Sequence, residues 1–177
     1  MTGLAISLPT LETERLVLRP PALRDFEAYA AFLASDRAAG IGGPRPRDMA
    51  FGDFCALIGH WHLRGYGRWV VADRHTDAAL GVVGLMLPEG WPEPEIAWSV
   101  FAGAEGRGIA REAAIRARRY AYETLGWTRV VSCTKADNLR SIALARRLGA
   151  VHEYDHDHPR HGRLLVWRHL SPAELGM

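Results

Sequence analysis

A glycine-rich segment at residues 95–112, EIAWSVFAGAEGRGIARE, carries the residue types that favour phosphate binding. An apolar run leads into a loop containing Gly106 and Gly108, and a helical pattern follows at once. Glycines let the main chain approach a ligand, and the free amides of a first helical turn point outward at the positive end of the helix dipole. Arg107 and Arg111 add positive charge there. The segment therefore predicts a cradle for phosphate groups.

Two other kinds of phosphate loop do not fit this segment. A Walker loop needs a Gly-Lys-Ser/Thr sequence, which is absent. A dinucleotide fingerprint needs a third glycine where Arg111 stands, and an acidic residue about 20 positions later, where the chain has Thr128 and Arg129. A plain tight turn before a helix remains the alternative, so the loop alone does not decide the function.

The periodicity of the remaining sequence indicates the elements that must position this loop. Alternating apolar residues predict strands, and apolar residues three and four apart predict helices. In chain order we expect a strand at 15–19, a helix at 24–35, a loop at 38–48, a helix at 49–64, strands at 68–72, 80–87 and 95–101, a helix at 109–125, a strand at 129–134, a helix capped by Asn138, and a hairpin of 151–154 with 163–169. This order predicts an α+β layout with one mixed sheet and helices on both faces.

Composition limits the class of protein. The 177 residues fit a single domain over 1–177, and 48% hydrophobic residues suffice for a core. A net charge of +2, without a basic run interleaved with aromatics, argues against a nucleic-acid partner. Cys55 and Cys133 lack metal or redox spacing and are expected to be reduced thiols. The opening MTGLAISLPT lacks a positively charged start, and no apolar run reaches about 20 residues, so we expect a soluble cytoplasmic protein without a membrane partner.

Four segments together resemble the GNAT superfamily of N-acetyltransferases, in particular its RimJ/RimL-like branch. They are LETERLVLRPPALRDFEAY at 11–29, WVVADRHTDAALGVVGL at 69–85, EIAWSVFAGAEGRGIAREA at 95–113 and CTKADNLRSIALARRLGA at 133–150. The resemblance extends over about residues 10 to 170 and depends on the order of the four motifs. It implies a GNAT-type α+β fold, with a mixed, mostly antiparallel central sheet of six to seven strands and helices on both faces. The implied activity is transfer of an acetyl group from acetyl-CoA to a primary amine, without a metal.

The resemblance also implies roles for individual residues. The amides of Gly106, Arg107, Gly108, Ile109, Ala110 and Arg111 would hold the pyrophosphate of coenzyme A. The strand ending at Val100 and Phe101 would separate from its neighbour and pair with the pantetheine arm. Asn138 would hydrogen-bond that arm, although helix capping is its alternative role. Ser141 would lie near the thioester sulfur or the phosphates.

An amine acceptor needs a base, because an alkyl amine with a pKa near 10 is mostly protonated at pH 7. Glu95 begins the strand that bears the implied oxyanion-binding amide near Val100, so we expect Glu95 to be the general base, acting through a water. Glu93 is a weaker alternative, and a merely solvent-facing glutamate is a third possibility. The acceptor itself is either a protein N-terminus or a small-molecule amine.

The sequence departs from the family pattern at three positions. Ala145 stands where many members carry a tyrosine that protonates the leaving thiolate, so Ser141, water or no acid takes that role. Glu105 places a carboxylate at the start of the phosphate loop, and Ala150 replaces an aromatic residue. The missing tyrosine leaves a catalytically weak acyl-CoA-binding sensor module as the alternative function.

Histidines and tryptophans are the other candidates for chemistry. His152, His156, His158 and His161 fall in a predicted hairpin tip, where we interpret them as a solvated turn and not a metal site. We interpret His60 and His62 as surface or core residues, with a place in the lining of the acceptor pocket as the alternative, and Trp91 as the lip of that pocket. Trp69, Trp98, Trp127 and Trp167 are expected to be packing residues. The chain is expected to be a monomer or a homodimer.

Overall fold

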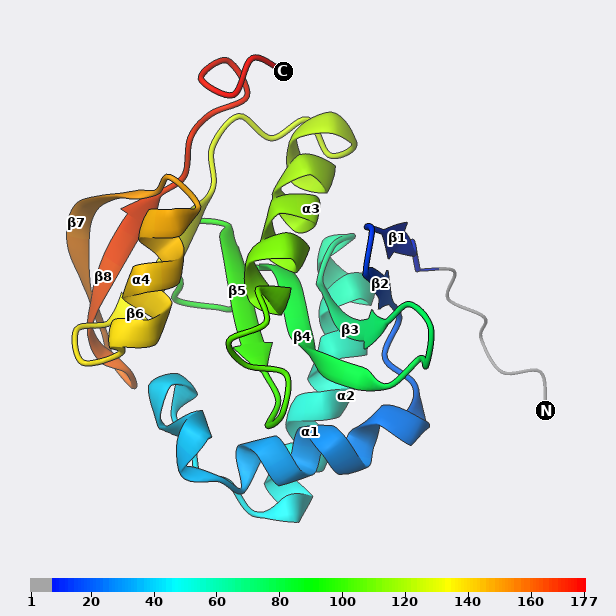
Figure 1. The fold of residues 1–177 in the computed structure, drawn as a ribbon. Helices are drawn as coiled ribbons and strands as arrows, with labels where there is room; N and C mark the ends of the chain where they lie inside the picture. Colours follow the sequence, from blue (N-terminus) through cyan, green and yellow to red (C-terminus); the bar gives the residue numbers. More distant parts are fainter. Residues whose placement is uncertain (1–7) are drawn as a thin grey trace.

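The computed structural model describes residues 8–177, which form one mixed sheet flanked by helices (Figure 1). Within these residues the sheet has eight strands in the order β1-β2-β3-β4-β5-β6-β8-β7. Their bounds are β1 Leu11–Glu12, β2 Leu16–Arg19, β3 Arg68–Asp73, β4 Ala79–Met86, β5 Glu95–Val100, β6 Val131–Lys135, β7 Val151–His158 and β8 Gly162–Arg168. The interpretation of MTGLAISLPT falls mostly outside the described residues.

Helices cover both faces of this sheet. They are α1 Phe26–Leu33, α2 Arg47–Arg64, α3 Ile109–Glu123 and α4 Leu139–Arg147, with two 3-10 helices, η1 Leu23–Asp25 and η2 Asp36–Ile41. The apolar stripe of α3, which includes Ile109 and Ala113, packs on Trp69 and Ile96 of the sheet. The aromatic residues of α1, together with Phe54 of α2, pack against the opposite face, on the side of Val70. This arrangement confirms the predicted α+β architecture. Among residues 8–177, no helix is long and apolar enough to cross a membrane.

Three details differ from the sequence-based expectation. The strand β1 adds one to the expected six or seven, and two residues are too few to show periodicity. The segment 38–48 is not entirely loop, because η2 reaches Ile41 and α2 starts at Arg47. The strand β7 runs on to His158, well past the predicted end at Tyr154, because its partner β8 continues the ladder to Gly162 opposite it.

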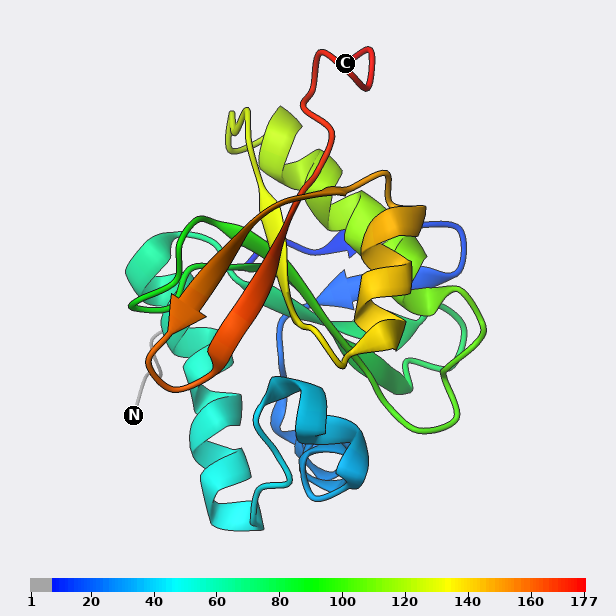
Figure 2. The same cartoon turned by 90° about the vertical axis from the view of Figure 1, so that its left-hand side faces the viewer.

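The sheet opens between its two central parallel strands. All other neighbouring strands are antiparallel, whereas β5 and β6 are parallel and pair only at Glu95 and Val131. Beyond this pair the strands diverge, and α3 and α4 both begin at the open end. Figure 2 shows α4 beside β6 and the β7–β8 hairpin, with α1 and η2 below the open end. The split therefore exposes strand edges and two helix N-termini to the same space.

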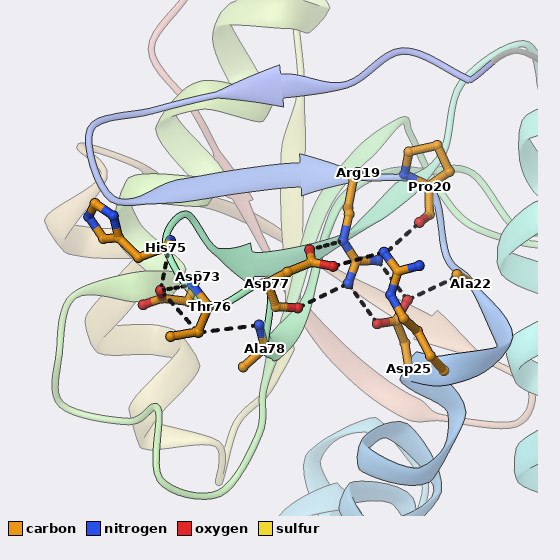
Figure 3. Close-up of polar contacts among 10 residues, drawn as sticks. Arg19, Pro20, Ala22, Asp25, Asp73, His75, Thr76, Asp77 and Ala78 are labelled. Carbon is orange, nitrogen blue, oxygen red and sulfur yellow. Dashed lines mark hydrogen bonds and ion pairs between the residues drawn. The ribbon is translucent and has the colours of Figure 1, made fainter.

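An ion-pair network that is buried at Arg19 and Asp25 joins β2 to its neighbours, away from the β5–β6 opening (Figure 3). The Arg19 guanidinium donates to both carboxylate oxygens of Asp25, each at 2.8 Å, and its Nε donates to Asp77 at 2.6 Å. Asp77 lies in the β3–β4 turn, and its hydrogen bond with Arg19 lowers the pKa of its carboxyl group. All three residues belong to the motifs that carry the family resemblance. Their part in the fold is to join β2, η1 and that turn.

We expect Asp25→Asn to destabilise the protein by about 1.5–3 kcal/mol, the usual cost of losing hydrogen bonds to a charged group. Asp25 is only 3% exposed, so the variant leaves a buried guanidinium with the exposed Asp77 as its one remaining charge partner among residues 8–177. Thermal or urea unfolding measures the change, with the exposed Glu14→Gln as the control variant. Equal stability of the two variants would show that the network contributes nothing.

Candidate active site

The glycine loop before α3 presents unoccupied amide groups to solvent. Gly106 and Gly108 adopt left-handed conformations with φ of 71° and 79°, and Gly108 is the N-cap of α3 without a side-chain cap. Residues 105–108 are exposed. The main-chain amides of residues 105–111 donate no hydrogen bond to any group within residues 8–177. The loop is thus free to bind an anion at the positive end of α3.

A groove of about 840 Å³ runs from this loop to the split in the sheet. Eight of the predicted cofactor-binding residues line it: Val100, Gly106, Gly108, Ile109, Ala110, Arg111, Asn138 and Ser141. Two others do not. The Phe101 ring packs in the core, 5.6 Å from the ring of Phe32, and Arg107 is exposed, with its carbonyl accepting a hydrogen bond from Arg15 at 3.0 Å.

The open edge of β5 lies along the groove. The Phe101 amide donates to the Leu80 carbonyl at 2.9 Å and is therefore directed toward β4. Because main-chain groups alternate along a strand, those of Trp98 and Val100 are directed toward the split. This edge is available for an extended ligand, as the sequence predicts for the pantetheine arm.

A second cavity, of about 680 Å³, meets the groove at the split. The two spaces share lining residues from β5, α4 and η2, including Trp98, Asn138 and Ser141. One space can hold a donor molecule and the other an acceptor, with the shared residues around the point where they react.

Glu95 lies in the wall of the second cavity. Its side chain is 5% exposed, and burial raises the pKa of its carboxyl group to about 7. The Trp91 indole nitrogen donates a hydrogen bond to one of its oxygens, which favours the ionised form. A carboxyl group that titrates near neutral pH in a cavity has the properties of a general base.

Glu93, the weaker candidate, occupies a different environment. Arg168 donates to both of its carboxylate oxygens, at 2.8 and 2.5 Å, and the Tyr154 hydroxyl donates to one of them at 2.9 Å. The Arg168 hydrogen bonds are the main reason why the pKa of Glu93 is lowered. Glu93 is absent from the lining of the cavity. Its carboxylate is thus committed to a structural ion pair.

Asn138 and Ser141 meet at the start of α4. The Asn138 side-chain oxygen accepts a hydrogen bond from the Ser141 amide at 3.2 Å, which makes it the helix cap. The Trp98 indole donates to the Ser141 hydroxyl oxygen at 3.2 Å, so the hydroxyl proton can point elsewhere. Ala145 is fully buried against Trp167 one turn further on, and no tyrosine hydroxyl is supplied from there.

Sequence reasoning missed three residues of the groove and the cavity. Trp98, interpreted as packing, lines both spaces. Arg37 from η2 and Arg140 from α4 also line the groove, and both pair with the Glu105 carboxylate, Arg140 at 3.0 Å. Arg140 could have been found from the sequence, because it is next to the predicted Ser141. Arg37 could not, because it lies in a segment without a motif.

The histidine cluster is only partly the solvated turn that the sequence suggested. His158 is 8% exposed, and its ring lies 4.9 Å from Trp91 and 4.7 Å from His161. The interpretation as a solvated turn is wrong for His158, because β7 extends to this residue and its side chain packs against the Trp91 ring. Among residues 8–177 no group of three or more His, Cys, Asp or Glu is arranged to hold a metal ion.

His60 lies outside this cavity. Its Nδ1 is 2.7 Å from the Tyr66 carbonyl, and its Nε2 accepts a hydrogen bond from the Leu87 amide at 2.9 Å. Both ring nitrogens therefore have structural partners.

A model of the acetyltransferase (GNAT) domain matches residues 15–151. The chain belongs to the GNAT acetyltransferase family. It is 28% identical over 148 residues to the uncharacterized N-acetyltransferase YoaA of Bacillus subtilis, covering 80% of this chain and 82% of that protein. This family uses acetyl-CoA as its acyl donor, so the chain is an N-acetyltransferase.

Solved structures agree with this assignment. An acetyltransferase from Agrobacterium tumefaciens strain C58 is 38% identical and has a TM-score of 0.85, covering 96% of this chain and 98% of the other. A GNAT-family acetyltransferase from Bordetella pertussis is 27% identical, with a TM-score of 0.77 and coverage of 92% and 99%.

Proposed function

We propose that this GNAT acetyltransferase moves the acetyl group of acetyl-CoA directly to a primary amine, with both substrates bound at the split between β5 and β6. The observation that carries the proposal is the meeting of two cavities at this split. The free amides of the glycine loop stand at the far end of one cavity, and the buried Glu95 stands in the wall of the other. Such an arrangement suits attack in a ternary complex.

Each half of the donor has a proposed binding surface. The diphosphate binds the amides from Gly106 to Arg111, because these amides have no acceptor within residues 8–177 and lie at the positive end of α3. The pantetheine arm lies along the open edge of β5 at Val100, with Asn138 on the opposite side. Ser141 then lies near the sulfur atom.

The chemistry follows from the groups around the junction. Ionised Glu95 takes a proton from the ammonium group, directly or through a water, and the neutral amine attacks the thioester carbonyl carbon. A main-chain amide at the β5 edge, near Val100, stabilises the oxyanion that forms. As the C–S bond breaks, the amine nitrogen loses its second proton, which passes through water to the leaving thiolate. The thiolate also accepts a hydrogen bond from Ser141, and a thiolate whose thiol has a pKa of about 8.5 leaves readily.

The acceptor is either a protein N-terminus or a small amine. A solved structure that is 18% identical, with a TM-score of 0.72, is of RimL, a ribosomal L7/L12 alpha-N-protein acetyltransferase in complex with coenzyme A. At this identity the likeness concerns the fold, so an N-terminal acceptor remains one proposal of two. The catalytically weak sensor module is less well supported, because a sensor has no need of a buried carboxyl group facing a second cavity.

Thioester turnover with detection of free thiol, over a panel of peptide N-termini and small amines, tests the proposed function. We expect at least one amine to release coenzyme A well above the rate of hydrolysis without acceptor. Tight binding of acetyl-CoA with no turnover on any amine would support the sensor instead.

Glu105 offers a prediction about donor binding. Its carboxylate lies at the start of the phosphate loop and pairs with Arg37 and Arg140, both of which line the donor groove. We expect Glu105→Gln to lower the KM for acetyl-CoA about two- to fivefold, because it removes a charge that repels the diphosphate and frees two guanidinium groups. Steady-state kinetics measure the change, with kcat unaltered. A raised KM would mean that Glu105 positions the arginines for binding.

A further inference from the structure

The acceptor cavity contains more positive charge than its own carboxylates neutralise. Four cationic side chains line it: Arg45, Arg68, Lys135 and Arg160. Of these four, Arg45 alone has an ion-pair partner among residues 8–177, Asp53 at 2.5 Å. The other three form no ion pair with a carboxylate within residues 8–177.

The acidic residues of the cavity do not balance these three cations. Asp53 is already paired with Arg45. Glu89 has a fully exposed side chain and lies 3.6 Å from Arg64, so it is turned to solvent. Glu95 is buried, and at neutral pH its carboxyl group is ionised only in part of the molecules. The cavity is therefore net positive.

The three free cations come from three different elements around the cavity. Arg68 begins β3, on the same side of that strand as Val70, and is half-buried. Lys135 ends β6, and its ammonium group donates to the Ala39 carbonyl of η2 at 3.3 Å. Arg160 is exposed in the turn between β7 and β8. Because cations in a partly desolvated space repel one another, such a set favours an anionic ligand.

We propose that the acceptor is a small amine that also carries an anionic group, a carboxylate or a phosphate, which Arg68 binds with the help of Lys135 and Arg160. The proposal rests on the proposed function, which places the acceptor in this cavity. A volume of about 680 Å³ suits a small molecule. The same charges disfavour polycationic acceptors such as polyamines and aminoglycosides, which would add like charge to the cavity.

Matched pairs of amines test the proposal, each pair differing in the anionic group. 4-Aminobutyrate is compared with 4-aminobutan-1-ol, and phosphoethanolamine with ethanolamine, which separates carboxylate from phosphate. Spermidine, kanamycin and the peptides Ser-Asp-Ala and Ser-Asn-Ala complete the panel. Binding is measured by calorimetry in the presence of coenzyme A, and turnover with acetyl-CoA is measured separately. Binding is thus read out even where no acetyl transfer occurs.

We expect the anionic member of at least one pair to bind at least tenfold more tightly than its neutral partner. Arg68→Gln should remove most of this advantage, Arg68→Lys should keep part of it, and Lys135→Gln provides a second test if the Arg68 variants fold poorly. The matched control is Arg119→Gln, which removes an exposed arginine of α3 that pairs with Glu123. It should leave the advantage unchanged.

The outcomes separate the two proposals. Preference for spermidine, kanamycin or the neutral partners would overturn the anionic acceptor while acetyl transfer stands. Preference for a peptide over the anionic small amines would overturn the assignment to small molecules, and binding of none of these amines would overturn the inference altogether. Selective binding of the anionic amines without turnover of any amine would support the cavity's charge preference and contradict the transferase mechanism.

Discussion

Glu95→Gln lowers kcat at pH 7 by about 10²–10⁴-fold, the usual contribution of a positioned general base. Glutamine keeps the size of the side chain and its contact with the Trp91 indole, but it cannot take a proton. Steady-state turnover of the best amine measures the loss. The matched control is Glu93→Gln, because Glu93 lies nearby but is bound to Arg168 and Tyr154 and does not face the cavity. A loss of activity in Glu93→Gln as large as in Glu95→Gln would contradict the assignment.

The same assignment predicts in which direction kcat changes with pH. The pKa of Glu95 is about 7, so wild-type kcat should rise between pH 6 and pH 8 as the carboxyl group ionises, and Glu95→Gln should lack this rise. We use kcat because it reports groups in the bound complex, whereas kcat/KM also contains the titration of the free amine.

The contribution of Glu95 to the free energy of unfolding should fall over the same pH range in which kcat rises. Burial raises the pKa of Glu95 above its ordinary value, so the folded protein binds a proton more tightly than the unfolded chain. The stability that this proton provides is complete below the unfolded pKa and is lost as the pH rises through about 7. Above pH 7 the fold bears the cost of a buried carboxylate, and Glu95→Gln removes that cost. We therefore expect the variant to melt at a higher temperature than wild type at pH 8, with little difference at pH 5.

The contrast between Glu93 and Glu95 shows where sequence reasoning ends. The position of Glu95 at the start of the predicted strand made it the first candidate, but nothing in the sequence pattern shows that Glu93 is held in an ion pair. Their difference comes from residues far along the chain, because Tyr154 and Arg168 reach Glu93 from the β7–β8 hairpin. Contacts between distant segments leave no trace in local periodicity.

Most of the fold was predictable because the strands and helices that build the split carry strong periodic patterns. The ends of the strands and helices were harder to predict. The strand β7 continues through Asp155 to His158 with polar residues that predict a turn, yet they remain in the ladder because β8 continues opposite them. The position of His158 beneath Trp91, in the wall of the acceptor cavity, could not have been inferred without that extension.

For the site, local motifs located the donor half better than the acceptor half. A phosphate loop and a capped helix start are formed by neighbouring residues, so Gly106, Gly108 and Asn138 could be named from the sequence. The acceptor cavity is built from single residues of separate elements. Arg68 and Lys135 each look like an ordinary charged residue at a strand end, and their shared surroundings appear only once the sheet is assembled.

Gly106→Val should weaken acetyl-CoA binding by about 10–100-fold. Gly106 lines the donor groove and has a φ of 71°, a conformation that costs a non-glycine residue about 1–2 kcal/mol and a β-branched residue more. Valine either strains this conformation or turns the neighbouring amides away from the diphosphate, and its side chain occupies the space that the ligand needs. Calorimetric titration with acetyl-CoA measures the affinity.

Gly126→Val separates the loss of binding from backbone strain. Gly126 has nearly the same φ, 68°, and a Cβ atom at either glycine would meet nothing within 4 Å. Gly126 follows α3 and lines neither the donor groove nor the acceptor cavity. Both variants should therefore lose similar stability, but only Gly106→Val should lose affinity. At a hundred times its dissociation constant, acetyl-CoA should stabilise wild type and Gly126→Val by about 2.7 kcal/mol, and Gly106→Val by much less at the same concentration. Equal affinities in the two valine variants would mean that the diphosphate does not bind at this loop, and the proposed orientation of the donor would fail with it.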